Sequence, residues 1–150
     1  MRALIQRVSS ASVSVDQKTA SSIQRGLLIL LGIEEADDSS DIDWLSSKIS
    51  LLRIFEDEEG KMNRSIQDIG GEVIVASQFT LHASTKKGNR PSFLKAAPPA
   101  ISDPLYRDFC DALSQKLNSP VGRGIFGADM QVTLTNDGPV TIWIDSRDKE

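Results

Sequence analysis

One aliphatic run, Leu27-Leu28-Ile29-Leu30-Leu31-Gly32-Ile33, carries no charged or polar side chain. Such a run is typical of a strand in a sheet whose two faces are both covered, because an exposed face would bring polar residues to every second position. We therefore predict a central strand at 27–33 and expect the rest of the sheet to assemble around it.

Alternating apolar and polar residues predict further strands along the chain. The alternation from Ala3 to Val15 is interrupted by Ser9-Ser10, which favours two short strands joined by a turn. Residues Glu72 to Ala76 form another apolar segment of strand length. These segments are the expected neighbours of the central strand.

Two alternating segments near the C-terminus, 130–134 and 140–144, flank a turn signal. Asp137-Gly138 is a strong two-residue hairpin signal, and proline is tolerated where the next strand begins. We therefore predict a hairpin in which the two segments pair with each other. A cis bond at Gly138-Pro139 does not follow from the sequence, because only about 5–6% of such bonds in folded proteins are cis.

Two segments carry apolar residues at helical spacing. The first follows several N-cap candidates at Asp37 to Ser40, and the second follows Asp103-Pro104, where a cap residue precedes proline. Asn118-Ser119-Pro120 is expected to end the second helix. The predicted buried faces consist of Ile42, Leu45, Ile49 and Leu52 in the first helix and Tyr106, Phe109, Leu113 and Leu117 in the second.

The order of these elements predicts an α+β fold. Strands outnumber helices and do not alternate with them, which favours a curved, barrel-like mixed or antiparallel sheet with two packed helices. The chain has 150 residues, which fits a single domain at 1–150. Asp145 to Glu150 is expected to form a frayed polar tail.

Composition excludes several classes of protein. A single cysteine, Cys110, rules out an internal disulfide framework, and no run approaches the roughly 20 apolar residues of a membrane helix. The segment Met1 to Arg7 loses its apolar character too early for a signal peptide, so we expect no membrane partner and a cytoplasmic protein.

The net charge of −4 argues against broad, charge-driven binding of nucleic acid. A local contact stays open, because Lys86-Lys87-Gly88-Asn89-Arg90 is the densest positive segment. Most surface charges serve solubility, so the alternative interpretation of this segment is a solvated loop.

Conventional catalytic and metal-binding patterns are missing. The only histidine is His82, so any Ser-His or Cys-His site would have to be built around that one ring. Cys110 follows Phe109 on a predicted helix, where a cysteine usually acts as a small hydrophobe. Zinc ligands at defined spacing, a calcium loop and nucleotide-binding glycine motifs are all absent, so we expect no metal and no cofactor.

A polar pentapeptide, Ser77-Gln78-Phe79-Thr80-Leu81, stands where the predicted strand at 72–76 runs out. If it stayed extended, Ser77 and Thr80 would face opposite sides and could not both point at one atom. Backbone N–H groups at a point where strand pairing ends are therefore at least as good candidates for stabilising an oxyanion. The alternative is an edge strand that ends in a polar loop.

The segments SQFTL at 77–81 and NDGPVT at 136–141, taken together, resemble the D-aminoacyl-tRNA deacylase family. The resemblance covers nearly the whole chain, and neither motif departs from the family pattern. Further similar segments are Arg2 to Val15, Gly26 to Gly32, Gly60 to Asn63, Lys87 to Phe93 and Phe126 to Met130.

This resemblance implies an enzyme that hydrolyses the ester between a D-amino acid, or glycine mischarged on tRNA(Ala), and the 3′ end of tRNA. It also implies a homodimer with two sites at the subunit interface. Gly138-Pro139, as a cis dipeptide held by Arg7, would reach into the site of the other subunit, and Met130 would border the amino-acid pocket. The residues implied to line the site within one subunit are Ser77, Gln78, Phe79 and Thr80.

The implied chemistry needs no catalytic triad, because an aminoacyl ester is activated and the neighbouring ribose 2′-hydroxyl can assist the attacking water. Orientation and oxyanion stabilisation by N–H groups around Phe79 and Thr80 would suffice, with the Thr80 hydroxyl as an alternative nucleophile. Rejection of L-amino acids would come from a rigid carbonyl pair at Gly138-Pro139 that captures the amino group. Lys86, Lys87 and Arg90 become candidate contacts to tRNA phosphates.

Two other functions remain open from the sequence. One is a dimeric RNA- or DNA-binding module without turnover, which the acidic net charge disfavours. The other is a general small-molecule esterase, which the missing nucleophile–base pair disfavours.

Overall fold

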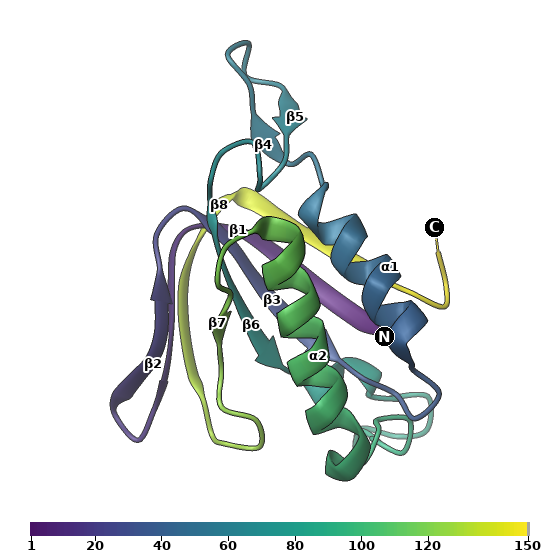
Figure 1. The fold of residues 1–150 in the computed structure, drawn as a ribbon. Coiled ribbons are helices and arrows are strands. Elements are labelled where there is room, and N and C mark those ends of the chain that lie inside the picture. Colours follow the sequence, from purple (N-terminus) through teal and green to yellow (C-terminus); the bar gives the residue numbers. More distant parts are fainter. Residues whose placement is uncertain (150) are drawn as a thin grey trace.

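The computed structural model describes residues 1–149 and has a curved mixed sheet with two helices packed on it (Figure 1). Strands β2, β1, β3, β6 and β7 follow one another in the sheet, and β8 also pairs with β1. The predicted fold class is confirmed. The strands are β1 (Arg2–Val15), β2 (Lys18–Ile23), β3 (Gly26–Gly32), β4 (Phe55–Glu56), β5 (Met62–Arg64), β6 (Glu72–Ser77), β7 (Gly122–Arg123) and β8 (Gln131–Asp145).

Strand β3 is central, as its aliphatic sequence predicts. It pairs antiparallel with β1 on one side and parallel with β6 on the other, and all of its residues except Leu30 are buried. The strand predicted at 72–76 is also confirmed, as β6. The parallel pair aligns Leu31 of β3 with Ser77, the last residue of β6.

The N-terminal prediction of two short strands is wrong, because β1 is one continuous strand. The chain reverses later, at Asp16 and Gln17, which both have positive φ. Ser9-Ser10 lies instead where the register between β1 and β8 shifts. The sheet absorbs the interrupted alternation as a bulge, so no turn is needed there.

The predicted C-terminal hairpin is also wrong. Strand β8 runs antiparallel to β1 along its whole length, with Val132 opposite Val13 and Ile144 opposite Ala3. The register jumps at the centre of β8, so that 137–139 bulge out of the ladder. The Asn136 side chain closes this bulge, because it accepts a hydrogen bond from the Val140 N–H at 2.7 Å and donates to the Val140 carbonyl at 3.1 Å.

Helix α1 (Ser39–Ser50) forms as the sequence predicts. Asp38 is its N-cap, and the Asp41 side chain completes a reciprocal capping box. Three of the four predicted apolar residues are buried on the helix, and the fourth, Leu52, lies beyond its end.

Helix α2 (Pro99–Leu117) begins earlier than predicted, and Pro104 lies inside it. Proline removes the hydrogen bond to the carbonyl four residues earlier, here that of Ala100. Ala100 is exposed, so water can satisfy this carbonyl and the helix continues. The predicted end is confirmed, because Asn118 caps the helix in a left-handed conformation.

The two helices lie side by side over one face of the sheet and enclose the main core (Figure 1). A smaller apolar cluster that includes Val8, Val13 and Leu28 lies apart from it. The predicted frayed tail is wrong up to residue 147, because Asp145 and Ser146 are buried and the Arg147 side chain pairs with Asp37 at 3.1 Å. Glu150 lies outside the described residues. Within the described chain, no helix combines the length and apolarity needed to span a bilayer.

Candidate functional site

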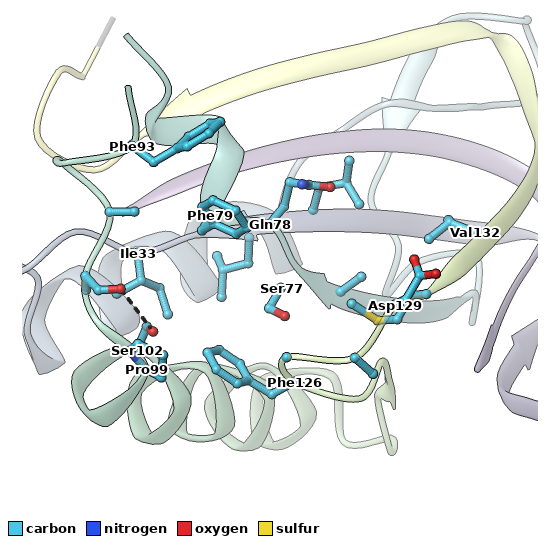
Figure 2. Close-up of a pocket in the computed structure, with 18 residues that line it drawn as sticks. Ile33, Ser77, Gln78, Phe79, Phe93, Pro99, Ser102, Phe126, Asp129 and Val132 are labelled. Carbon is cyan, nitrogen blue, oxygen red and sulfur yellow. Dashed lines mark hydrogen bonds between the residues drawn. The ribbon is translucent and has the colours of Figure 1, made fainter. Parts of the chain in front are cut away.

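A cavity of about 620 Å³ lies between the end of β6, the start of α2 and the segment that joins β7 to β8 (Figure 2). Its volume is in the range of small-molecule sites. The lining residues are Leu30, Leu31, Ile33, Ala76, Ser77, Gln78, Phe79, Phe93, Ala96, Ala97, Pro99, Ser102, Phe126, Gly127, Ala128, Asp129, Met130 and Val132.

Few polar side chains face this mostly apolar cavity. The Ser102 hydroxyl is engaged by the carbonyl of Pro98, to which it donates at 3.1 Å. Ser77 points toward the centre of the cavity in Figure 2, with Gln78 on one wall. Asp129 is the one ionisable residue among the described residues of the lining.

The chain leaves β6 by a tight turn and does not remain extended. The Gln78 N–H still donates to the Leu31 carbonyl at 2.7 Å, and the short helical turn η1 (Phe79–His82) follows at once. The first N–H groups of a helical turn have no acceptor within the turn. Accordingly, the N–H groups of Phe79 and Thr80 donate no hydrogen bond within residues 1–149, whereas the Leu81 N–H donates to the Gln78 carbonyl.

Gly32 allows η1 to rest directly on the end of β3. A Cβ atom at this position would lie 2.9 Å from the Leu81 Cβ and 3.1 Å from the Gln78 carbonyl oxygen. Contacts this short would force the turn to move. The direction in which the two free N–H groups point is therefore set by β3 as well as by the motif itself.

The four site residues predicted at the strand end separate into two groups. Ser77, Gln78 and Phe79 line the cavity, whereas Thr80 is exposed beside it. The Thr80 hydroxyl accepts a hydrogen bond from the Gln78 side-chain amide at 2.5 Å. No acceptor that could act as a base contacts this hydroxyl among the described residues, so the geometry favours the N–H groups over a Thr80 nucleophile.

Two aromatic residues that the sequence did not single out as site residues, Phe93 and Phe126, complete the cavity wall. Phe79, which is 56% exposed, meets Phe93 edge to face with ring centroids 5.1 Å apart, and Phe126 lies across the cavity. Apolar residues are normally assigned to a core, so nothing marked them as site residues. The feature of the sequence that could have identified Phe93 and Phe126 is that both lie in polar, glycine-containing segments.

The basic segment lies on a loop at the rim of the cavity. Ser84 and Ser92 close this loop through two backbone hydrogen bonds of 2.8 and 2.9 Å, and Phe93 follows directly. Lys86, Lys87 and Arg90 are exposed on the loop and do not line the cavity. Met130, by contrast, is part of the lining.

The other predicted motif lies elsewhere in the chain. Arg7 is only 5% exposed, and its guanidinium donates to the carbonyls of Asp137 at 2.8 Å and Ile54 at 2.7 Å. It thereby fixes the bulge that contains Gly138-Pro139, whose peptide bond is cis.

This bulge does not line the cavity of its own chain. Arg7 lies opposite Leu27 of β3, whereas Ser77 lies opposite Leu31. Four residues of extended strand separate these positions by roughly 13 Å. The two motifs that the sequence singled out are therefore apart within one chain.

His82 and Cys110 are unsuited to catalysis. Both are fully buried, and neither ring nitrogen of His82 has a hydrogen-bond partner among the described residues. Burial raises the pKa of the Cys110 thiol to about 11, so the thiolate is scarce at neutral pH. No group of three or more potential metal ligands occurs within residues 1–149.

The burial of His82 predicts a pH dependence of folding stability. Burial lowers the pKa of His82 below its ordinary value of 6.5, so the unfolded chain binds a proton that the folded chain does not. The contribution of neutral His82 to the free energy of unfolding is therefore fully present above pH 6.5. It is lost as the pH drops from 6.5 toward the pKa of His82 in the folded state, by up to about 1.4 kcal/mol per pH unit. Urea unfolding between pH 7.5 and 5 measures how the free energy of unfolding changes with pH. In His82→Gln this slope should be smaller by the equivalent of about one bound proton. Equal slopes in the two proteins would contradict the prediction.

Comparison with known proteins gives consistent matches over the whole chain. A family model described as D-Tyr-tRNA(Tyr) deacylase matches residues 4–145. Proteins named D-aminoacyl-tRNA deacylase from Bacteroides thetaiotaomicron and Flavobacterium psychrophilum are each 61% identical over 150 residues, covering 100% of this chain and of their own lengths.

Two solved structures resemble the fold closely. A structure described as the c-Myc DNA unwinding element binding protein superimposes with a TM-score of 0.92 at 41% identity, covering 97% of this chain and 98% of that one. A probable eukaryotic D-amino acid tRNA deacylase superimposes with a TM-score of 0.82 over 95% and 97% of the two chains. At 16% identity the second match concerns the fold alone.

Proposed function

Since the chain belongs to the D-Tyr-tRNA(Tyr) deacylase family and is a hydrolase of ester bonds, we propose that it cleaves the ester joining a D-amino acid to the 3′ end of tRNA. The observation that carries this proposal is the turn η1, which offers two free N–H groups at the wall of a cavity in which the described residues form no nucleophile–base pair. Such a site suits a substrate that is already activated.

The two N–H groups are assigned to the oxyanion of the tetrahedral intermediate. When water adds to the ester carbon, negative charge develops on the carbonyl oxygen, and fixed N–H donors stabilise this charge more than the neutral substrate. The donors of Phe79 and Thr80 need not break a hydrogen bond within the chain before they act.

The proton transfers are assigned to the substrate's own ribose 2′-hydroxyl. His82 is the last residue of the turn and is fully buried, and the described residues that line the cavity include no histidine. The 2′-hydroxyl adjacent to the ester positions the water and assists removal of its proton. The bond from the carbonyl carbon to the ribose 3′ oxygen then breaks, that oxygen takes up a proton, and the free amino acid and tRNA leave.

The selection of D over L substrates is assigned to the Gly138-Pro139 bulge of a second copy in a homodimer. Two contacts support a rigid element here, because the Arg7 guanidinium and the Asn136 amide both fix the bulge. The exposed carbonyls would capture the substrate amino group and leave no room for an L side chain. Glycine has no side chain to exclude, so glycyl-tRNA, including glycine mischarged on tRNA(Ala), is a substrate too.

A deacylation assay with D-tyrosyl-, L-tyrosyl- and glycyl-tRNA tests the proposed function. The D and glycyl esters should be hydrolysed and the L ester spared. A general esterase would cleave both tyrosyl esters, and a binding module, which the name of one structural relative suggests for that protein, would cleave none. The proposed activity on tRNA implies a cytoplasmic protein.

The basic loop is expected to contribute affinity for tRNA without base specificity. Replacing Lys86, Lys87 and Arg90 by serine should raise KM and flatten its dependence on salt, because each lost phosphate contact removes about 0.7–0.9 from the logarithmic salt slope. The kcat should stay unchanged, because none of the three side chains lines the cavity.

A matched control for the loop changes the same number of charges elsewhere. Lys18, Lys48 and Lys149 are exposed on other parts of the chain, and their triple serine variant should leave KM and its salt slope close to the wild-type values. Steady-state kinetics between 50 and 200 mM salt (roughly the range over which such contacts are screened) measures both variants. Equal effects of the two triple variants on KM and its salt slope would mean that the loop is a solvated surface segment and does not contact tRNA.

A further inference from the structure

The connection between β6 and α2 carries the free N–H groups of the site, yet few hydrogen bonds join it to the rest of the described chain. Within residues 1–149, only one hydrogen bond joins residues 79–95 to the part of the chain before residue 78 or after residue 96. In this bond the Arg2 Nη1 donates to the carbonyl of Leu81, in η1, at 3.0 Å. Beyond its packing on β3, η1 is therefore hydrogen-bonded to the rest of the described chain through one side chain from another strand.

Arg2 is itself firmly placed by the sheet. It lies at the start of β1, opposite Gly32 on β3 and opposite Asp145 on β8. Its Nε donates to the Asp145 carboxylate at 2.8 Å, and its guanidinium lies 5.6 Å from the centre of the Trp143 ring. A guanidinium held on two sides presents its remaining donor in a fixed direction.

Gly32 and Arg2 act on the same turn from neighbouring strands. Gly32 leaves the space in which Leu81 and His82 sit, as its missing Cβ would clash with both. Arg2 supplies the polar contact that fixes the turn in that space. Neither residue is a catalytic residue, because Arg2 does not line the cavity and Gly32 has no side chain.

We propose that Arg2 is a positioning residue for catalysis: it ties η1 to Asp145 and Trp143 of β8 and so orients the N–H groups of Phe79 and Thr80. This role rests on the proposed function of those groups as oxyanion donors. Oxyanion stabilisation requires donors placed to within a fraction of an ångström, so a loosened turn weakens the transition state more than it weakens substrate binding.

Arg2→Met tests the role, because methionine keeps a long, unbranched stem beside Trp143 but removes every donor. We expect kcat to fall about ten- to a hundredfold, as for loss of a charged hydrogen bond, while KM changes by less than about twofold. Arg2→Lys keeps the charge but cannot bridge Asp145 and Leu81 at once, so its kcat should lie between those of the wild type and Arg2→Met.

Two further variants separate positioning from loss of stability. In Arg2→Met the buried Asp145 carboxylate loses a partner, so the double variant Arg2→Met with Asp145→Asn removes that unpaired charge. Its kcat should match that of Arg2→Met even if its melting temperature recovers. Arg107→Met breaks an exposed ion pair with Asp103 on α2 and should leave kcat unchanged.

Hydrogen exchange makes the test independent of activity. The Leu81 and Ala83 amides close the turn through the carbonyls of Gln78 and Thr80, and in Arg2→Met they should exchange at least about tenfold faster, with β3 and β6 unchanged. Faster exchange with wild-type kcat would show that Arg2 holds the turn but that the turn does not limit catalysis, which overturns the proposal. Unchanged exchange, or a rise in KM alone, overturns it as well. Inactive wild-type protein in the tRNA assay would reject the proposed function, and exchange would still decide whether Arg2 holds the turn.

Discussion

Phe79→Pro is expected to lower kcat for D-aminoacyl-tRNA by about 10²–10³-fold relative to Phe79→Ala, which is the usual cost of removing one oxyanion donor. Phe79 is the first residue of η1, where proline fits a helical backbone and its N–H donates no bond within the described chain. The preceding Gln78 has φ of −145° and ψ of 82°, so it lies outside the α region that a following proline disfavours. Proline therefore removes the donor with little disturbance of the turn.

Two companion variants isolate the donor from the side chains. Phe79→Ala removes the ring, and with it the edge contact to Phe93, but keeps the N–H. Thr80→Ala removes the hydroxyl and should retain kcat within a few-fold of the wild-type value, because among the described residues that hydroxyl is hydrogen-bonded only to Gln78. Single-turnover deacylation of D-tyrosyl-tRNA compares all three. Equal rates for the proline and alanine variants at 79 would exclude the Phe79 N–H, and abolished turnover in a folded, tRNA-binding Thr80→Ala would restore the hydroxyl as nucleophile.

Gly138→Ala is expected to have the second large effect, on the selection between D and L substrates. Gly138 has a φ of +148°, and a Cβ there would lie 2.8 Å from the Val140 Cγ2 and 2.9 Å from the Val140 nitrogen. The bulge must shift to relieve these contacts, so its carbonyls move away from the position that captures the amino group. We expect the ratio of D to L deacylation rates to fall about 10–100-fold, chiefly through slower D turnover.

The control for Gly138→Ala carries the same kind of backbone strain at a remote position. Gly60 lies between β4 and β5 with a φ of +76°, and a Cβ added there would have no atom of the described chain within 4 Å. Gly60→Ala therefore costs stability without a clash. Its D-to-L ratio should equal that of the wild type. A Gly138→Ala variant that is dimeric, folded and as selective as the wild type would reject the bulge as the stereochemical filter.

Elements whose signals are local could be predicted from the sequence, and elements that depend on a neighbour could not. The Asp38 cap with its apolar stripe and the aliphatic run at 27–33 each specify their own structure. Ser9-Ser10 and Asp137-Gly138 also look like turns locally. In the sheet, however, β1 and β8 pair along their whole length. The two interruptions in the apolar–polar alternation become shifts of register between these strands.

The candidate site divides in the same way. The polar donors at the end of an apolar strand drew attention to residues 77–80, and the resemblance to the deacylase family assigned them to the site. Their conformation was not predicted, because a helical turn in place of an extended end requires the Leu31 carbonyl, the space above Gly32 and the Arg2 guanidinium. These partners are distant in sequence, and nothing in the pentapeptide encodes them.

The unbroken strand β1 connects the cavity end of the sheet with the bulge of β8. Arg2 at its start holds the hydrolytic turn, and Arg7, five residues later on the opposite face, holds the bulge assigned to stereochemical selection. Inserting or deleting one residue between them would reverse the side on which one arginine emerges and change their spacing of roughly 16 Å. The number of residues between Arg2 and Arg7 should therefore be constant among proteins that keep both roles.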